Sequence, residues 1–172
     1  MSLIKYLLTE IAQTGSITVY HATNDPEQSF KKNNKIFTST SKKFVLSYGD
    51  NIFELTINPK NTFYSTDVKD IEKLYKKGFL LGDPYLDSEI DMYPNIKDHY
   101  VIDNYEGYYP SAEDFIKGTE MMGNTWEPIE RTRGVVDWIE RNNYDCIYLL
   151  EDGAETYFIL DMSIIKSIKE IE

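Results

Sequence analysis

Residues 17–23 read Ile-Thr-Val-Tyr-His-Ala-Thr, and residues 36–40 read Ile-Phe-Thr-Ser-Thr. β-Branched and aromatic residues dominate 17–21 and 36–38, which predicts a β-strand over each of these two ranges. In the first stretch small residues follow His21 at once, so a ligand can approach the backbone closely there. The alternative for His21 is a histidine at a strand end whose hydrogen bonds are satisfied within the protein. These two strands are where we expect a functional site.

A short helix with an aromatic residue at its end follows the second strand. The hydroxyl residues 39–41 precede Lys42, and the segment up to Tyr48 is predicted to be helical with a hydroxyl cap. Ser-Tyr-Gly-Asp at 47–50 then leads into residues 51–57, which alternate apolar and polar residues and predict a half-buried strand. This order can place the ring of Tyr48 over a pocket, and the alternative is that Tyr48 belongs to the core at the helix end.

The remaining elements predict an α+β fold with a central, mostly antiparallel sheet. Apolar residues at helical spacing predict helices near the N-terminus and over 67–77, 111–122 and 125–142. Residues 146–150 and 156–160 predict two strands joined by the turn 151–154, and 164–168 predict a short edge strand. We expect one domain over residues 1–172.

An acidic stretch over roughly residues 82–110 interrupts this pattern. It carries seven Asp and Glu residues and six tyrosines but one lysine, Lys97, and it shows no clear periodicity. We interpret it as an insertion with irregular structure. A solvated acidic loop is one reading of this insertion, and a surface that binds a partner is the other, because tyrosine is enriched at interfaces.

The composition excludes several classes of protein. The 172 residues include 18 Lys and Arg against 29 Asp and Glu, which gives a formal net charge of −11. Generic nucleic-acid binding and binding to anionic membranes are not expected, because both need a positive surface. A single cysteine excludes a disulfide framework, and His21, His99 and Cys146 do not have the spacing of a zinc site. No segment has the roughly 18 apolar residues of a membrane span, and we expect a cytoplasmic protein. Because the His and Cys residues lack the spacing of a zinc site, we expect no metal centre.

Three motifs together resemble the first half of the ADP-ribosyltransferase fold. They are Tyr-His-Ala-Thr at 20–23, Ile-Phe-Thr-Ser-Thr at 36–40 and Ser-Tyr-Gly-Asp at 47–50. The segments 144–147 and 156–161 are similar to the last strands of that fold. The His-Tyr-Glu group, which includes diphtheria toxin and the poly(ADP-ribose) polymerases, is the most similar, and small phage-encoded members belong to it. The resemblance covers roughly residues 17–58 and 126–168, and it implies a split β-sandwich of small sheets with flanking helices and the acidic insertion.

The resemblance implies NAD as the cofactor and a role for each matching residue. His21 would hydrogen-bond the ribose on the adenosine side of NAD, and the backbone of Ala22, followed by Thr23, would hold the nicotinamide amide. Tyr48 would stack on the nicotinamide ring, whose positive charge an aromatic face favours. The second strand would line the same cleft with Phe37, Thr38 and Ser39.

The chain departs from the family pattern at the residues that matter most for catalysis. Phe37 stands where the family has the first of two pocket tyrosines, and Thr156 stands where the family has its glutamate. A carboxylate is needed near the ribose because positive charge develops there as nicotinamide leaves. Glu155 is one residue earlier and would need a bulge at 153–154 to turn inward from the family register. Glu151 in the turn is the other candidate, since small phage members of the family are expected to carry an acidic residue there.

We therefore expect an NAD-dependent mono-ADP-ribosyltransferase that modifies a macromolecule, most simply a host or target protein. The chain itself would be a phage or bacterial effector. Two other readings stay open. In one, the chain is a catalytically inactive member of the fold that inhibits or sequesters a partner, which Thr156 favours. In the other, it is an RNA 2′-phosphotransferase, which the acidic charge and the absence of arginines near His21 disfavour.

Overall fold

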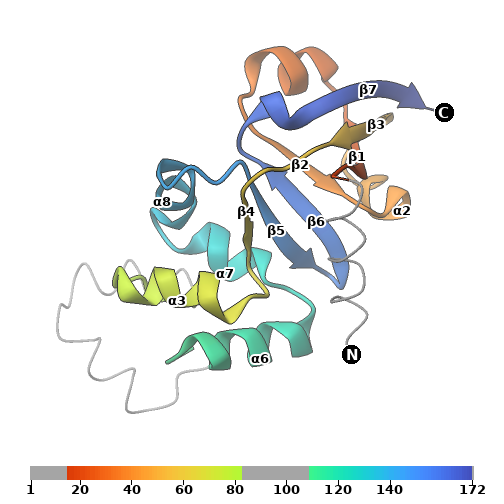
Figure 1. Cartoon of the computed structure of the whole chain (residues 1–172). Coiled ribbons are helices and arrows are strands. Elements are labelled where there is room, and N and C mark those ends of the chain that lie inside the picture. The colour runs from red at the N-terminus through yellow and green to blue at the C-terminus, as the bar shows by residue number, and fades with distance from the viewer. Residues whose placement is uncertain (1–14, 83–108, 172) are drawn as a thin grey trace. The chain divides into compact units, whose positions relative to one another are not determined.

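The computed structural model describes residues 15–82 and 109–171 (Figure 1). The chain divides into two compact units, one formed by Met1–Thr62, Asp145–Ile147 and Ala154–Glu172, the other by Phe63–Tyr144 and Tyr148–Gly153. The predicted N-terminal helix and residues 83–108 of the predicted insertion lie outside the described residues. The single domain over 1–172 stays a prediction.

The first unit is built on an antiparallel sheet with the strand order β6-β2-β1-β3-β7. The predicted strands of this unit are all present; β1, β2 and β7 extend beyond their predicted C-terminal ends, and β6 begins two residues earlier than predicted. Their bounds are β1 Ile17–Thr23, β2 Ile36–Ser39, β3 Asn51–Ile57, β6 Ala154–Ile159 and β7 Ile165–Ile171. The predicted edge strand is β7, which pairs with β3 over its whole length apart from an irregularity between Thr56 and Ile57.

One face of this sheet is the core of the first unit. Successive strand residues point to opposite faces, and residues paired across neighbouring strands share a face. Its fully or almost fully buried members come from four strands: Val19, Ile36, Thr38, Phe53, Leu55, Ile57, Tyr157 and Ile159. We call the face that carries these residues the core face. Burial of so many β-branched and aromatic side chains supplies the main stabilisation of this unit.

Short helical segments connect these strands. A π-helix, η1 (Gln28–Lys32), lies between β1 and β2. Helix α2 (Lys42–Val45) is shorter than predicted and has the expected hydroxyl cap, with the Ser41 side chain accepting from the Phe44 amide. A 3₁₀ turn, η2 (Met162–Ile164), leads into β7.

The second unit carries most of the helices and two strands. Their bounds are β4 Thr62–Tyr64, α3 Val68–Lys76, α6 Ala112–Met122, α7 Trp126–Arg131, α8 Val135–Arg141 and β5 Cys146–Glu151, of which Thr62, Cys146 and Ile147 belong to the first unit. The main chain of β5 is tied to its surroundings: Tyr148 accepts from the Ser65 amide, and Leu150 accepts from the Thr125 amide.

The single helix predicted over 125–142 is wrong. The chain forms α7 and α8 instead, and Gly134 separates them with a φ of 81°. The side chain of Thr125 does not cap α7, because its hydroxyl hydrogen-bonds the side chain of Ser65 and accepts from the Leu150 amide. The α+β class is confirmed by the sheet and the helices together.

Candidate functional site

The imidazole of His21 is fixed in one tautomer by the neighbouring strand. Its Nδ1 lies 2.7 Å from the carbonyl oxygen of Phe37. A carbonyl oxygen only accepts hydrogen bonds, so Nδ1 carries the proton and Nε2 is left as an acceptor. The hydrogen bond thus prepares His21 to receive a donor at Nε2.

Nε2 of His21 is buried and has no hydrogen-bond partner among the described residues. Burial lowers the pKa of His21 from its usual value of 6.5, and the hydrogen bond to Phe37 partly opposes this shift. The ring is therefore neutral at pH 7. A buried acceptor without a partner costs about 1–3 kcal/mol, which a hydroxyl donor from a ligand would recover.

Phenylalanines surround the His21 ring on the core face. The ring of Phe30 meets His21 edge to face at a centroid distance of 5.5 Å, and it meets Phe53 in the same manner at 4.9 Å. Thr23 holds the loop that carries Phe30, because its hydroxyl accepts from Ser29 Oγ at 2.9 Å. Thr23 is thus engaged in shaping the site. Phe30 was not predicted as a site residue; its only signal in the sequence is that it is the one aromatic residue of the polar, lysine-rich stretch 24–34.

The strand register shows which acidic residue shares a face with His21. Tyr20 pairs with Ser39, and Ser39 pairs with Thr156, so Thr156 lies on the same face as Tyr20 and opposite to His21. Glu155 therefore lies on the His21 side of the sheet. Strand β6 pairs with β2 without a register shift from Thr156 to Ile159, so Glu155 reaches this side from a regular strand.

The main chain at Glu155 is firmly held. Its carbonyl oxygen accepts from the amide of Thr40 at 3.0 Å and from Ser39 Oγ at 2.8 Å. The side chain is half-buried. The main chain of Glu155 therefore has a defined position on the His21 side of the sheet, two strands away from His21.

The other residues of β1 and β2 that were predicted to line the site are buried or half-buried and make contacts within the protein. Thr38 is fully buried, and its hydroxyl donates to the carbonyl of Tyr157 at 2.9 Å, so neither this hydroxyl nor that of Ser39 points to a ligand. Phe37 is half-buried at 6.1 Å from Phe158, on the face opposite to His21. Ala22 is buried, also on that opposite face.

Tyr48 lies next to a segment that packs against the end of β1. Its side chain is 50% exposed, with the ring 5.7 Å from that of Phe44. The backbone of Gly49 lies directly against Thr23: a Cβ atom added at Gly49 would be 2.4 Å from the carbonyl carbon of Thr23. The side-chain amide of Asn51 donates from Nδ2 to the Thr23 carbonyl at 3.0 Å. The half-exposed ring of Tyr48 thus belongs to the residue before Gly49, whose backbone lies against the end of β1.

Glu151 is the last residue of β5, in the second unit, and is half-buried. The turn predicted after it is present, with positive φ angles of 49° at Asp152 and 76° at Gly153. Two such residues in a row are typical of a two-residue hairpin turn.

The lysines are unevenly distributed along this acidic chain. Residues 28–49 contain five lysines and no Asp or Glu, although the whole chain has a net charge of −11. Two of them, Lys31 and Lys32, form the end of η1 just after Phe30, and Lys42 and Lys43 open α2. The segment that carries Phe30 and Tyr48 is therefore positively charged, although the net charge of the whole chain is negative.

Cys146 is not suited to nucleophilic chemistry. It is fully buried, its Sγ lies 3.2 Å from the hydroxyl of Thr62, and burial raises the pKa of its thiol to about 12. A protonated thiol in the core is inert. The described residues contain no group of three or more His, Cys, Asp or Glu side chains that could hold a metal ion.

We expect Cys146 to be unreactive in the native protein and reactive after unfolding. The measurement is the rate of modification by a chromogenic disulfide reagent at pH 8, with and without denaturant. Protection should be at least a hundredfold, because only opening of the core exposes the thiol. Fast modification of the native protein would contradict the buried position.

Comparison with known proteins gives little that bears on function. No protein-family model matches the chain, and no curated protein matches it. One solved structure, the crystal structure of an anti-CRISPR protein, is similar at 15% identity over 91% of this chain and 96% of that chain, with a TM-score of 0.44. None of the helices in residues 15–82 and 109–171 has the length and apolar character that crossing a bilayer requires.

Proposed function

We propose that this protein is an NAD-dependent mono-ADP-ribosyltransferase of the His-Tyr-Glu group, with the split β-sandwich of that fold, and that it modifies a protein. The observation that carries the proposal is a neutral His21 with a buried, unpartnered Nε2 acceptor on the side of the sheet to which Glu155 points. The sequence motifs around His21 and Tyr48 give the same assignment.

The residues present fit NAD chemically. A ribose hydroxyl is a donor that Nε2 of His21 would accept, and the exposed ring of Tyr48 is available to stack on a positively charged nicotinamide. The lysines of residues 28–49 would balance the negative diphosphate. Ala22 would contribute only its backbone, since its side chain is on the opposite face of the strand.

When bound, NAD supplies an ADP-ribosyl group and a good leaving group, nicotinamide. The chain's own contribution is to orient the ribose through His21, to place a ring with Tyr48 and to set a carboxylate near developing positive charge. Glu155 is assigned this last role because its face matches that of His21. In the overall reaction the bond between ribose and nicotinamide breaks, a bond to the acceptor forms, and the acceptor loses a proton.

A catalytically inactive interaction protein is the second candidate. Thr156 and Phe37 stand where the family has glutamate and tyrosine, and both lie on the face opposite to His21. Such a protein would bind NAD or no nucleotide, and it would inhibit or sequester a partner.

Incubation with NAD separates the two candidates. We expect release of free nicotinamide that depends on the protein, together with transfer of labelled ADP-ribose to a protein in a cell lysate. Binding of NAD by calorimetry without nicotinamide release would favour the inactive interaction protein. The absence of both NAD binding and nicotinamide release would contradict the NAD assignment.

The neutral state of His21 predicts how NAD binding depends on pH. Protonation converts Nε2 from an acceptor to a donor, so affinity should fall as the pH drops through the pKa of His21. Because that pKa is lowered from 6.5, we expect constant affinity between pH 8 and 6.5 and a decline only below pH 6.5. Calorimetric titrations across this range test the prediction, and His21→Gln should remove the decline along with part of the affinity. A decline centred above pH 6.5 that persists in the variant would contradict it.

A further inference from the structure

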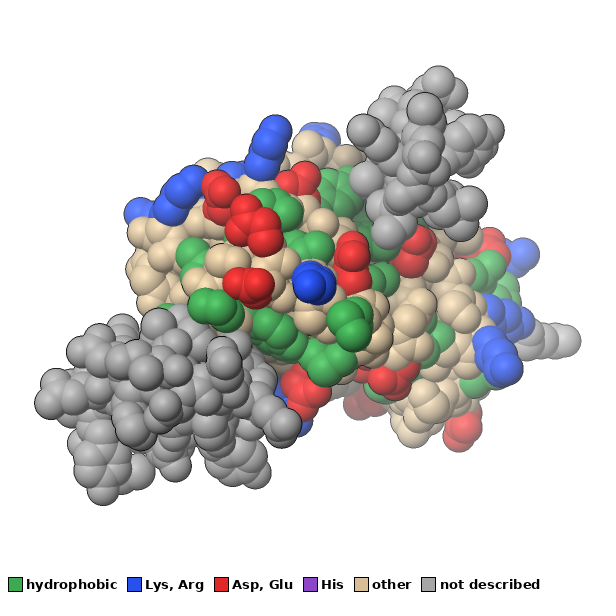
Figure 2. Space-filling model, turned by 90° about the horizontal axis from the view of Figure 1, so that it is seen from below, with side chains coloured by type: hydrophobic (Ala, Val, Ile, Leu, Met, Phe, Trp, Pro, Cys, Tyr) green, Lys and Arg blue, Asp and Glu red, His purple; other side chains and the backbone are tan. Residues whose placement is uncertain are grey.

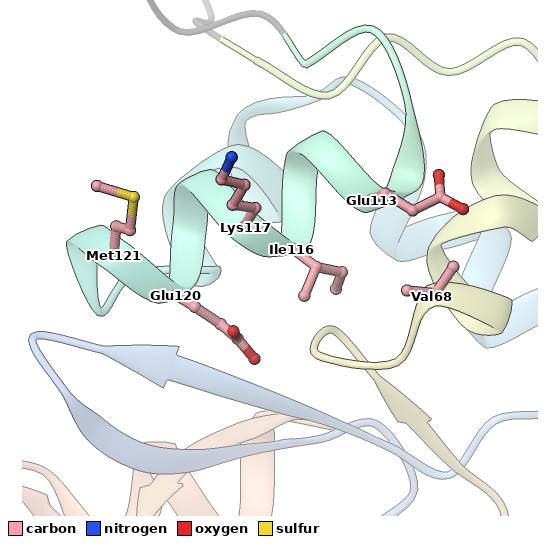
Figure 3. A pocket seen from close by; sticks show the side chains of 6 residues that line it. All are labelled: Val68, Glu113, Ile116, Lys117, Glu120 and Met121. Carbon is pink, nitrogen blue, oxygen red and sulfur yellow. The ribbon is translucent and has the colours of Figure 1, made fainter.

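A shallow groove in the second unit is independent of the residues assigned to NAD. It has a volume of about 510 Å³ and lies between α6 and the first residue of α3; we call it the α6 groove. It is lined by Val68, Glu113, Ile116, Lys117, Glu120 and Met121. Figure 3 shows Glu113 next to Val68, with Ile116 and Glu120 on one side of the helix and Lys117 on the other.

Helix α6 is well fixed, so this surface is preformed. Ser111 caps its first turn and Gly123 ends it with a φ of 65°. On the inner side Phe115 is fully buried against the ring of Tyr109. Gly118 lets that ring lie close, since an added Cβ would be 2.3 Å from it. The outer side therefore keeps a constant spacing of side chains.

The outer side of α6 combines exposed apolar groups with carboxylates that form no ion pair with a described residue. Met121, which lines the groove, is 83% exposed, which is unusual for an apolar side chain. Glu113 and Glu120 form no hydrogen bond or ion pair with any described residue, and Lys117 between them is not paired with either. Figure 2, seen from below Figure 1, shows hydrophobic side chains lying among acidic ones on this side of the molecule.

We infer that the α6 groove binds a basic amphipathic helix of a partner protein. Glu113 and Glu120 are seven residues apart, which is about 10 Å along a helix axis. Ile116 lies between them along the helix, and Val68 at the start of α3 contributes a second apolar side chain to the same groove. A partner helix with basic residues seven positions apart and leucine-like residues between them matches both features, because flexible Met side chains adapt to apolar groups and carboxylates select the positive charge.

The charges of the residues that line the α6 groove favour this partner over others. The lining residues carry two carboxylates and one ammonium group, so a nucleic acid or an anionic membrane surface would be repelled. An acidic or uncharged helix would leave both glutamates without a partner as they lose water. The inference does not rest on the proposed transferase activity.

A designed peptide tests the inference. The probe is a fluorescent 14-residue helical peptide with lysines seven positions apart and leucines at the third and fourth positions between them; its counterpart carries glutamates in place of the lysines. Fluorescence anisotropy with the full chain should show saturable binding of the lysine peptide, at least tenfold tighter than that of the glutamate peptide. Raising NaCl from 0.05 to 0.5 M should weaken it.

Variants tie this binding to the α6 groove. Glu113→Gln/Glu120→Gln should weaken binding of the lysine peptide roughly three- to tenfold, and Met121→Gln should weaken it further. The matched control is Glu130→Gln/Asp137→Asn, which removes two exposed carboxylates from α7 and α8 and should leave the affinity unchanged. Circular dichroism checks that each variant is folded. Equal weakening by the control pair, or equal binding of both peptides, would overturn the inference.

Discussion

Replacing Glu155 by glutamine is expected to lower the rate of nicotinamide release about 10²–10³-fold while leaving NAD binding nearly unchanged. The carboxylate is assigned to stabilise positive charge that develops only as the bond to nicotinamide breaks. Loss of one such preorganised electrostatic contact costs a factor of this size in the chemical step. The expected pattern is therefore a lower kcat at similar KM. Single-turnover release of nicotinamide at saturating NAD is the direct measurement.

Glu151→Gln is the matched control, because it makes the same change in a half-buried residue at the end of β5. We expect it to keep most of the activity. Full activity of Glu155→Gln together with loss of activity in Glu151→Gln would transfer the role to Glu151. Full activity of the Glu151→Gln/Glu155→Gln double variant would exclude both carboxylates from this role.

Replacing Gly49 by alanine is expected to give the largest loss of stability among the changes considered. The added Cβ would be 2.4–2.6 Å from three backbone atoms of Thr23, distances that no side-chain rotation can relieve. The backbone must move, which costs about 1–3 kcal/mol in a well-packed region. For a chain of this size each kcal/mol corresponds to about 2–4 °C in Tm. Thermal and urea unfolding monitored by circular dichroism would measure the loss.

Gly78→Ala is the control for this effect. An added Cβ at Gly78 meets nothing within 4 Å, and the only cost is the positive φ of 87°, about 1–2 kcal/mol. Because Gly49 directly follows Tyr48 and its backbone lies against Thr23, the Gly49 variant should bind NAD more weakly even at temperatures where it is folded, whereas Gly78→Ala should not. Equal NAD affinity of the two folded variants would contradict the proposed position of Tyr48 beside the end of β1.

Local pattern was sufficient for the strands of the first unit and for the turn at 151–154. Their alternating apolar residues and the Asp-Gly pair carry the information within a few positions. The break between α7 and α8 was missed, because the apolar spacing continues across it. Gly134, whose positive φ separates the two helices, was the available signal.

The chemistry of His21 needed contacts that are distant in the sequence. Its tautomer is set by the carbonyl of Phe37, sixteen residues away, and its low pKa comes from burial beneath side chains such as Phe30. No local pattern around His21 specifies either contact. The motif predicted that this residue matters, but the state of its ring is a property of the packed sheet.

The choice between acidic residues divides in the same way. Alternation along a strand already required Glu155 and Thr156 to point to opposite faces, and composition already gave an acidic chain with one isolated cysteine. Which of the two faces belongs to His21 depended on the pairing of β1 with β2 and of β2 with β6. A shift of one residue in either pairing would exchange the faces. The period of two is local, whereas the register is fixed only when all three strands pack together.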